Sequence, residues 1–268
     1  MNWEKIVRVI SQVSNIPQFG LVSDVDGTIS QIVDHPEMAI VKPEISTILT
    51  ELVKEMPVVA IVSGRAVDDV RKRVGIPGIV YIGNHGLERY VDGEVIVKNE
   101  AMQFREVLQN DYHEMESLLK PGMLLEDKNV TLSLHYRIVE YPDEVRKQFL
   151  PVIKNIGEKY QLQFSEGRMV FELRPAIKLN KGTALFEVIQ DYSLEAALYL
   201  GDDTTDVAAM KEAVRLREMG ECQSFGIGVV SDNMPQELQE TADYVISGVD
   251  GVERLLSTLL SSRRASST

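Results

Sequence analysis

Short, nearly continuous apolar runs recur along the chain, and three of them end directly in a polar cluster. Runs without polar alternation are typical of strands that are buried on both faces of a parallel sheet. Between them, apolar residues recur three and four positions apart over about 45–56 and 184–189, which predicts helices. Strands that alternate with helices predict a doubly wound, Rossmann-type α/β sheet. The three runs cover residues 20–23, 58–62 and 197–200.

The polar clusters that end these runs point to one edge of the predicted sheet. Asp24, Ser63 and Gly201-Asp202 each begin where an apolar run stops. In open α/β sheets, ligands bind beyond the carboxyl ends of the strands. Three polar clusters at this edge therefore predict a binding or catalytic site, in preference to three unrelated solvated loops.

The middle of the chain has a different pattern, with a hairpin signal, two helical stretches and two alternating segments. Asp92-Gly93, between residues 89–91 and 94–97, is a favoured two-residue hairpin turn. Helices are predicted over about 100–119 and 142–160, and half-buried strands over 129–137 and 168–174. These elements predict a small α+β domain.

Each alternating strand has one apolar and one polar face. Leu132, Leu134 and Tyr136 share a face of the first strand, and Met169, Phe171 and Leu173 share a face of the second. The apolar faces are expected to pack on the helices. The polar faces would then either close over a ligand or face water.

We therefore predict an α/β core, formed by residues 1–100 and 177–268, with an inserted α+β domain at 101–176. Residues 1–18 predict a short amphipathic helix, because charged residues interrupt their apolar positions. Residues 261–268 are polar and predict a disordered tail.

Composition narrows the classes of protein that remain. The chain has 268 residues, 44% of them hydrophobic and 26% charged, which is ordinary globular composition. A formal charge of −13 argues against nucleic acid or an anionic membrane surface as a partner. No apolar run is long enough to predict a transmembrane helix, and one cysteine excludes an internal disulfide. The cytoplasm is the expected location.

Asp24 and Asp26 form the first candidate catalytic cluster. Two carboxylates at a strand end can both lie near one phosphate only if the chain turns sharply, and Gly27 permits that turn. The alternative is a surface turn, in which Asp-Gly is common, but the buried strand before it disfavours this interpretation. Neighbouring carboxylates also favour a divalent cation, because their repulsion otherwise raises one pKa.

Two more clusters are placed at predicted helix starts. Ser63-Gly64-Arg65 precedes an apolar helical pattern, where it would either cap the helix or present free N–H groups to a phosphate. Taken alone, capping is the favoured interpretation. Lys181 also begins a helix, at the unfavourable end of the helix dipole, and neutralising a bound phosphate would explain its position.

Asp202, Asp203 and Asp206 follow the third buried run. Acidic residues at a helix start need no special explanation. Together with Asp24 and Asp26, however, they would complete a Mg²⁺ site, because Mg²⁺ prefers hard oxygen ligands.

In this order, DVDGT, SGR, a lysine before a helix and GDDTTD resemble the haloacid dehalogenase (HAD) superfamily of phosphohydrolases. Within that superfamily, the chain resembles the trehalose-6-phosphate phosphatases. The resemblance rests on Gly83–Glu88, Glu126–Lys128 through Arg137, Glu172–Pro175, Asn180–Gly182 and Ala242–Val245. One departure is Leu179, where this family usually carries tryptophan, and it puts the substrate in some doubt while leaving the chemistry untouched.

The resemblance implies a HAD-like core with a cap domain, and a role for each motif. Asp24 would be the nucleophile and form an aspartyl-phosphate, while Asp26 would be the general acid and then the general base. Ser63 and Lys181 would bind the phosphoryl oxygens. The implied Mg²⁺ site comprises Asp24, the backbone carbonyl of Asp26, and Asp202, with Asp203 and Asp206 in support.

The inserted domain would supply substrate specificity. Paired donors and acceptors suit a hydroxyl-rich sugar, and by the resemblance Glu88, Lys128 and Glu172 would contact the distal glucose. The alternative for each is a surface ion pair. The full set of expected substrate-binding residues is Gly64, Arg65, Asn84, His85, Glu88, Lys128, His135, Arg137, Glu172 and Arg174.

Three alternatives stay open from the sequence. The substrate could be another sugar phosphate, such as a mannosyl phosphoglycerate or sucrose phosphate. The chain could also be a silent sugar-phosphate-binding domain, although all the motif residues are present, or a phosphotransferase. Functional pairing with a trehalose-6-phosphate synthase is a further expectation.

Overall fold

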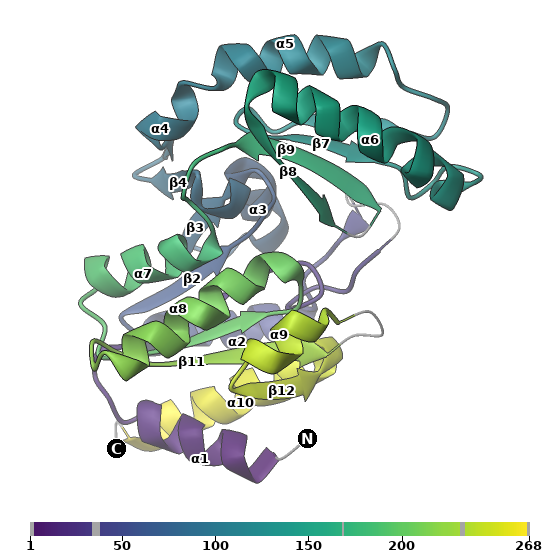
Figure 1. Cartoon of the computed structure of the whole chain (residues 1–268). Helices are drawn as coiled ribbons and strands as arrows, with labels where there is room; N and C mark the ends of the chain where they lie inside the picture. Colours follow the sequence, from purple (N-terminus) through teal and green to yellow (C-terminus); the bar gives the residue numbers. More distant parts are fainter. Residues whose placement is uncertain (1–2, 34–37, 168, 231–233, 267–268) are drawn as a thin grey trace. The chain divides into compact units, whose positions relative to one another are not determined.

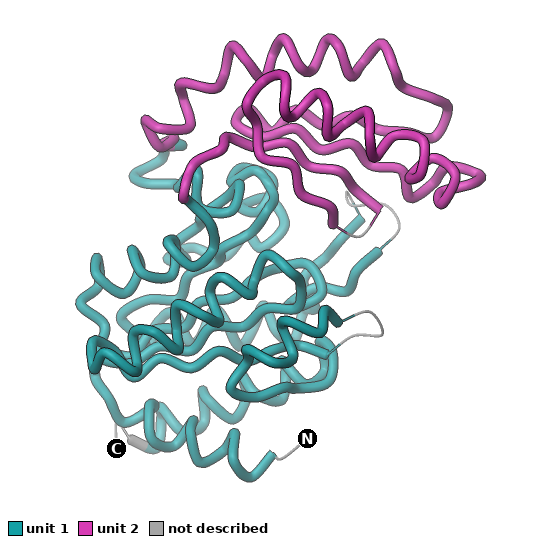
Figure 2. Tube along the Cα trace, viewed as in Figure 1, with its two compact units in different colours: residues 1–95, 179–268 teal, residues 96–178 magenta. Residues whose placement is uncertain are grey.

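The computed structural model describes residues 3–33, 38–167, 169–230 and 234–266. The chain divides into two compact units, which Figure 2 colours separately. Unit 1 comprises Met1–Val95 and Leu179–Thr268, and unit 2 is Ile96–Lys178. The insertion expected from the sequence, 101–176, lies within unit 2.

The centre of unit 1 is an eight-stranded sheet (Figure 1). Six strands are parallel, and β4 turns back antiparallel to β3. In sheet order, the strands are β12 (Tyr244–Ser247), β11 (Gln223–Val230), β10 (Ala196–Gly201), β1 (Phe19–Ser23), β2 (Val58–Val62), β3 (Val80–Gly83), β4 (Glu88–Val91) and β5 (Glu94–Val97). The turn between β4 and β5 has positive φ at Asp92 and Gly93, as the hairpin signal predicts.

Helices cover both faces of this sheet, which confirms the doubly wound α/β fold. Neighbouring residues of one strand pack on opposite faces of the sheet. Leu21 belongs to the apolar cluster on one face, and Val22 belongs to the cluster on the other. One face packs on α1 (Trp3–Val13), α2 (Pro43–Glu55), α3 (Val67–Val74) and α10 (Gly248–Ser266). The other packs on α7 (Lys181–Asp191), α8 (Val207–Glu218) and α9 (Gln236–Thr241).

The parallel register brings the ends of the three predicted strands together. Ser23 at the end of β1 pairs with Leu200 on one side and with Ile61 on the other. Every residue of β1, β2 and β10 is buried, as expected for central parallel strands. The polar clusters that follow these strands therefore share one edge of the sheet.

Unit 2 is a four-stranded antiparallel sheet with helices on one face. The order is β6 (Leu124–Asp127), β7 (Leu132–His135), β9 (Val170–Pro175) and β8 (Leu162–Gly167). Its helices are α4 (Asn99–Met102), α5 (Arg105–Glu116) and α6 (Pro142–Tyr160). Leu132, Leu134, Phe171 and Leu173 pack on α5 and α6, which confirms these positions of the predicted apolar faces. Met169 was predicted on the same face, but it has a positive φ of 59° before β9 begins, and it is 43% exposed.

Two predicted elements of unit 2 are wrong in extent. The strand expected over 129–137 is only β7, because Asn129 takes a left-handed conformation with φ 70° in the turn after β6. The helix expected over 100–119 is interrupted at Phe104, whose N–H bonds the carbonyl of Ala101 in a tighter turn. Arg168, at the start of the second predicted strand, lies outside the described residues.

The two ends of the chain differ in how well the sequence predicts them. The amphipathic N-terminal helix is present as α1, with Ile6, Val9, Ile10 and Val13 buried. The disordered tail is wrong for residues 261–266, which continue α10. Arg263 explains this, because its guanidinium donates to the backbone carbonyls of Ser14, Ile16 and Glu55. Among the described residues, no helix is long and apolar enough to cross a membrane.

Asp111 is a buried acid in unit 2. It lies on the same face of α5 as Leu108 and Met115, and neither carboxylate oxygen has a hydrogen-bond partner among the described residues. Burial raises the pKa of Asp111 to about 7, with a further rise from Glu114 and an opposing effect of Lys159. The folded protein therefore binds a proton here that the unfolded chain has released, and stability falls as pH rises from about 4 through 7.

We predict that Asp111→Asn removes this pH dependence. Relative to the variant, the wild type should lose about 2–3 kcal/mol of unfolding free energy between pH 5 and pH 8. Urea unfolding, with hydrogen exchange of α5 and α6 as the local readout, measures the difference. Glu106→Gln, at an exposed position of the same helix, is the matched control. Parallel pH profiles for wild type and Asp111→Asn would contradict the prediction.

Candidate active site

The first candidate residues lie in the turn that follows β1. The backbone N–H of Asp24 donates to the carbonyl of Leu200 at 2.9 Å, so pairing with β10 continues into the motif. The carbonyl of Val25 then accepts hydrogen bonds from residues 28–30, which closes a tight turn. Gly27 has a φ of 81° in that turn, so the sharp turn predicted from the sequence is confirmed.

Gly27 also lets the turn after β1 lie against the turn after β10. A Cβ atom built on Gly27 would be 2.1 Å from Oδ2 of Asp202. Only glycine combines the positive φ with so close an approach. The contact brings the first and last acidic motifs together in space.

Lys181 is held at the start of α7 by a helix cap. The side chain of Asn180 accepts from the N–H groups of Gly182 and Thr183, at 2.9 and 3.1 Å. The lysine side chain is only 2% exposed; its Nζ lies 3.0 Å from Oδ2 of Asp24 and 2.7 Å from Oδ1 of Asp206. Two carboxylates thus explain a lysine at the unfavourable end of a helix dipole.

Asp206 holds this arrangement together from the short 3-10 helix Thr204–Asp206. Besides Lys181, its Oδ1 accepts from the hydroxyl of Tyr199 at 2.6 Å. Its Oδ2 accepts from the backbone N–H groups of Asp202 and Asp203, at 3.1 and 3.0 Å. Since both oxygens are engaged, the geometry favours a supporting role for Asp206 over direct contact with a substrate.

Burial dominates the electrostatics of the cluster. Desolvation raises the pKa of Asp24 to about 7, although Lys181 opposes the rise. Desolvation lowers the pKa of Lys181, but Asp206 and Asp24 outweigh it and the net shift is upward, so the lysine stays charged. A further positive charge beside Asp24 would therefore be needed to keep its carboxylate fully ionised at neutral pH.

The residues present fit a divalent cation. Asp24, Asp202 and Asp206 are buried, and each offers a carboxylate oxygen within 4.8 Å of the others. Three carboxylates and one ammonium group leave an excess of negative charge at a buried site, which favours a bound cation. Carboxylate oxygens are hard donors of the kind that Mg²⁺ prefers. Asp203 is less central, because its side chain accepts from the N–H of Thr204 and caps the short helix.

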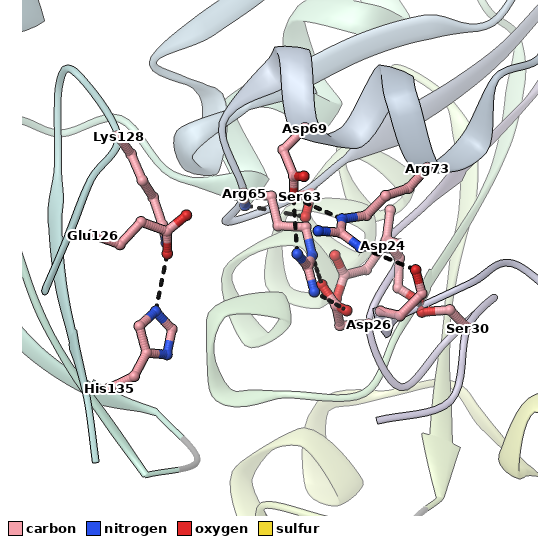
Figure 3. A network of polar contacts seen from close by, with 12 residues as sticks. Asp24, Asp26, Ser30, Ser63, Arg65, Asp69, Arg73, Glu126, Lys128 and His135 are labelled. Carbon is pink, nitrogen blue, oxygen red and sulfur yellow. Dashed lines mark hydrogen bonds and ion pairs between the residues drawn. The ribbon is translucent and has the colours of Figure 1, made fainter. Parts of the chain in front are cut away.

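Asp26 points to a different partner, the guanidinium of Arg65 (Figure 3). Arg65 Nε donates to Oδ2 of Asp26 at 2.5 Å, and Nη2 donates to Oδ1 at 2.8 Å. The third nitrogen, Nη1, donates to Asp69 at 2.8 Å. Arg65 was expected to bind substrate, and in this structure it holds the carboxylate of Asp26.

The Ser63 turn is bound to the turn that follows β3. The N–H of Asn84 donates to the carbonyl of Arg65 at 2.8 Å, and the N–H of His85 donates to that of Ser63 at 2.9 Å. Asn84 and His85 both have positive φ, which is uncommon for residues other than glycine. A Cβ on Gly64 would lie 2.5 Å from the imidazole of His85, so these two expected substrate residues are in contact with each other.

Glu88 caps α3, the role that the sequence favoured for the Ser63 motif. The helix begins at Val67 after Ala66, with no side-chain cap from the preceding residues. Oε1 of Glu88 accepts from the N–H of Val67 at 2.5 Å, and Glu88 is buried in unit 1. The capping interpretation of Ser63 is therefore wrong, and a glucose contact by Glu88 stays a prediction.

In unit 2, the polar face of the sheet carries a compact charged cluster (Figure 3). Lys128 Nζ lies 3.5 Å from Oε1 of Glu172 and 3.9 Å from Oε2 of Glu126. His135 Nε2 is 2.9 Å from the same Glu126 oxygen. Lys128 and Glu172 are each only 10% exposed in their side chains, so this is not an ordinary solvated ion pair.

The remaining expected residues are less well defined by contacts. Arg174 belongs to β9 on the polar face, and its Nε is buried without a hydrogen-bond acceptor among the described residues. Arg137 lies after the end of β7.

Three residues make contacts with the expected ones but were assigned no role from the sequence. Glu126 contacts Lys128 and His135, Tyr199 donates to Asp206, and Asp69 accepts from Arg65. Glu126 lies in the Glu126–Lys128 motif, which is the one signal that could have indicated it, whereas the other two contacts depend on the folded chain.

The fold of this chain is similar to that of solved HAD-like structures. A haloacid dehalogenase-like hydrolase from Bacteroides thetaiotaomicron matches with a TM-score of 0.63 at 15% identity, covering 89% of this chain and 98% of that one. The C-terminal domain of the C. albicans trehalose-6-phosphate phosphatase matches with a TM-score of 0.79 at 19% identity, and 97% of each chain is covered.

The trehalose-phosphatase family matches residues 22–243. Trehalose-phosphate phosphatase B of Arabidopsis thaliana is 30% identical over 267 residues, which cover 92% of this chain and 67% of the relative. The chain belongs to the trehalose-phosphatase family, a family of phosphoric monoester hydrolases. The resemblance seen in the sequence motifs is thereby confirmed.

We predict that Gly27→Ala lowers activity at least 100-fold, because the new Cβ collides with the carboxylate of Asp202. The matched control is Gly75→Ala, at another positive φ with nothing within 4 Å of its Cβ. The control should cost about 1 kcal/mol of stability and leave turnover unchanged. Steady-state phosphate release and thermal unfolding separate the two effects. Equal activity in both variants would contradict the close contact.

Proposed function

We propose that this chain hydrolyses trehalose 6-phosphate to trehalose and phosphate, with unit 1 as the phosphatase core and unit 2 as a cap domain. The observation that carries the proposal is the buried contact of Asp24 with Lys181 at the carboxyl edge of the sheet. Family membership supports the substrate, and the Asp24–Lys181 contact supports phosphoryl transfer.

In the first step, a carboxylate oxygen of Asp24 attacks the phosphorus atom, and the bond from phosphorus to the sugar oxygen breaks. Asp26 enters this step protonated and gives its proton to that leaving oxygen, and Arg65 then binds the carboxylate that results. In the second step, a water molecule attacks the phosphorus of the aspartyl-phosphate, Asp26 takes a proton from it, and the bond to Asp24 breaks. The carboxylate of Asp24 is restored and phosphate leaves.

Charge compensation is the main demand of this chemistry, because a carboxylate must approach an anionic phosphate. Lys181 stands beside the nucleophile and is placed to stabilise phosphoryl oxygens. Ser63, buried in the turn after β2, is assigned to the same phosphate. Asp206 and Tyr199 keep the lysine in position through their hydrogen bonds.

Mg²⁺ is the proposed metal. Asp24 and Asp202 would hold it together with the backbone carbonyl of Asp26, while Asp206 and Asp203 would support those ligands. The ion would offset negative charge on the nucleophile and on the phosphate. The acidic cluster of unit 1 supplies the oxygen donors for this ion. Its excess of negative charge is the reason that a cation would bind there.

Unit 2 is assigned to sugar recognition. Lys128, Glu172, Glu126 and His135 present donors and acceptors on one face of a sheet, which suits the hydroxyl groups of a disaccharide. Arg137 and Arg174 remain proposed contacts of the same kind. A functional pairing with a trehalose-6-phosphate synthase follows only from this substrate, which such a synthase would supply, and stays a prediction.

The substrate is tested by phosphate release with Mg²⁺ from a panel of phosphate monoesters. The panel comprises trehalose 6-phosphate, sucrose 6-phosphate, glucose 6-phosphate, mannosyl-3-phosphoglycerate and p-nitrophenyl phosphate. We expect kcat/KM for trehalose 6-phosphate to lead by 100-fold or more, about 2.7 kcal/mol of discrimination in the transition state. Asp24→Asn and removal of metal by EDTA should each abolish turnover.

A different leading sugar phosphate would leave the phosphatase chemistry intact and overturn the substrate. A flat profile that Asp24→Asn abolishes would overturn the assignment of unit 2. If no member of the panel is hydrolysed, the silent binding-domain alternative holds, despite the intact motifs.

The role of unit 2 is tested with Lys128→Ala. We predict that KM for trehalose 6-phosphate rises at least tenfold, because Glu172 is left buried without its cation. Hydrolysis of p-nitrophenyl phosphate, which has no sugar, should change by less than twofold. Lys147→Ala, an exposed lysine of α6, is the control. Equal losses on both substrates would indicate a folding defect and not sugar recognition.

A further inference from the structure

Asp69 lies one helical turn beyond Arg65 and holds its guanidinium (Figure 3). Its Oδ2 accepts from Nη1 of Arg65 at 2.8 Å and from Nε of Arg73 at 2.7 Å. Arg65 and Arg73 are largely buried, with side chains 15% and 13% exposed. One carboxylate oxygen of Asp69, in the first turn of α3, therefore bridges Arg65 before the helix and Arg73 in its last turn.

Arg65, whose guanidinium is fixed by Asp69, in turn fixes the carboxyl group of Asp26. A guanidinium is planar, so fixing Nη1 sets the directions in which Nε and Nη2 can donate. Those two nitrogens are the ones that bind both carboxylate oxygens of Asp26. The orientation of the Asp26 carboxyl group thus depends on a residue that does not touch it.

Asp69 is itself anchored on its far side. Arg73 donates from Nη1 to the backbone carbonyl of Ala39, at 3.1 Å, in the segment that leads into α2. Burial tends to raise the pKa of Asp69, but the hydrogen bonds from Arg73 and Arg65 outweigh it and lower the pKa. Asp69 is therefore ionised at neutral pH and keeps both arginines in place.

We propose that Asp69 is a positioning residue for the acid–base step, acting through Arg65 on the carboxyl group of Asp26. The inference rests on the proposed function, since it takes Asp26 as the group that protonates the leaving sugar oxygen. Asp69 would need no contact with substrate. Its neighbour Asp68 lies on the same helix but pairs with Arg71, away from this chain of contacts.

The leaving group distinguishes positioning from general support of the fold. A sugar oxygen departs as a strongly basic alkoxide unless it is protonated, so it depends on Asp26. The p-nitrophenolate ion departs without a proton. A residue that orients the acid should therefore matter for a sugar phosphate and hardly at all for p-nitrophenyl phosphate.

The experiment compares Asp69→Asn with Asp68→Asn on both substrates. For Asp69→Asn we expect kcat on trehalose 6-phosphate, or on whichever sugar phosphate leads the panel, to fall about 10- to 30-fold, as for loss of one charge-assisted hydrogen bond. KM should stay within twofold, and turnover of p-nitrophenyl phosphate within threefold. Asp68→Asn should match the wild type on both substrates.

A double variant tests the path through Arg65. If Asp69 acts through that arginine, Asp69→Asn adds less than twofold to the loss caused by Arg65→Met alone. If the loss of activity in the double variant equals the product of the two single losses, Asp69 does not act through Arg65. Equal losses of Asp69→Asn on the two substrates, or no loss on either, would overturn the positioning role.

Asp26→Asn separates this inference from the proposed function. A large loss on the sugar phosphate with a small loss on p-nitrophenyl phosphate upholds the acid role of Asp26, whatever Asp69→Asn does. If Asp26→Asn shows no dependence on the leaving group, the acid role itself fails, and the role of Asp69 fails with it. Thermal unfolding of every variant shows which of them are folded.

Discussion

The structure depends on a charged cluster that is buried where three parallel strands end. Removing carboxylates and an ammonium group from water is expensive, and it is tolerated only when each charge has well-placed partners. Lys181 touches Asp24 and Asp206, and Asp206 in turn uses Tyr199 and two backbone N–H groups. Helix capping and the contact at Gly27 serve this same cluster. The fold in this sense holds the buried carboxylate of Asp24 beside the ammonium group of Lys181.

The parts of this arrangement that the sequence predicts are those governed by local rules. An apolar run that stops at Asp24 or before Asp202 predicts a buried strand with a polar end, and both strands are fully buried in the sheet. Gly27 predicts its turn because few other residues adopt positive φ. The motifs around these residues were sufficient to indicate the family, and the match over residues 22–243 agrees with them.

The contacts that escaped prediction join residues far apart in the chain or in different elements. Glu88 caps α3 from β4, which comes after β3 in the chain, so spacing near Ser63 favoured the wrong cap. The tail became helical because Arg263 binds carbonyls of residues 14, 16 and 55, whereas its polar composition suggested disorder. Asp69 resembles any surface acid until Arg65 and Arg73 are seen around it.

The central claim is that the buried carboxylate of Asp24 is the nucleophile. The most direct measurement is a rapid acid quench of enzyme turning over sugar phosphate with a labelled phosphoryl group, followed by mapping of the label. The account predicts a label on the peptide containing Asp24, stable in acid, released by hydroxylamine as expected for an acyl phosphate, and absent in Asp24→Asn. Turnover without any protein-bound label, or a label on another residue, would contradict it.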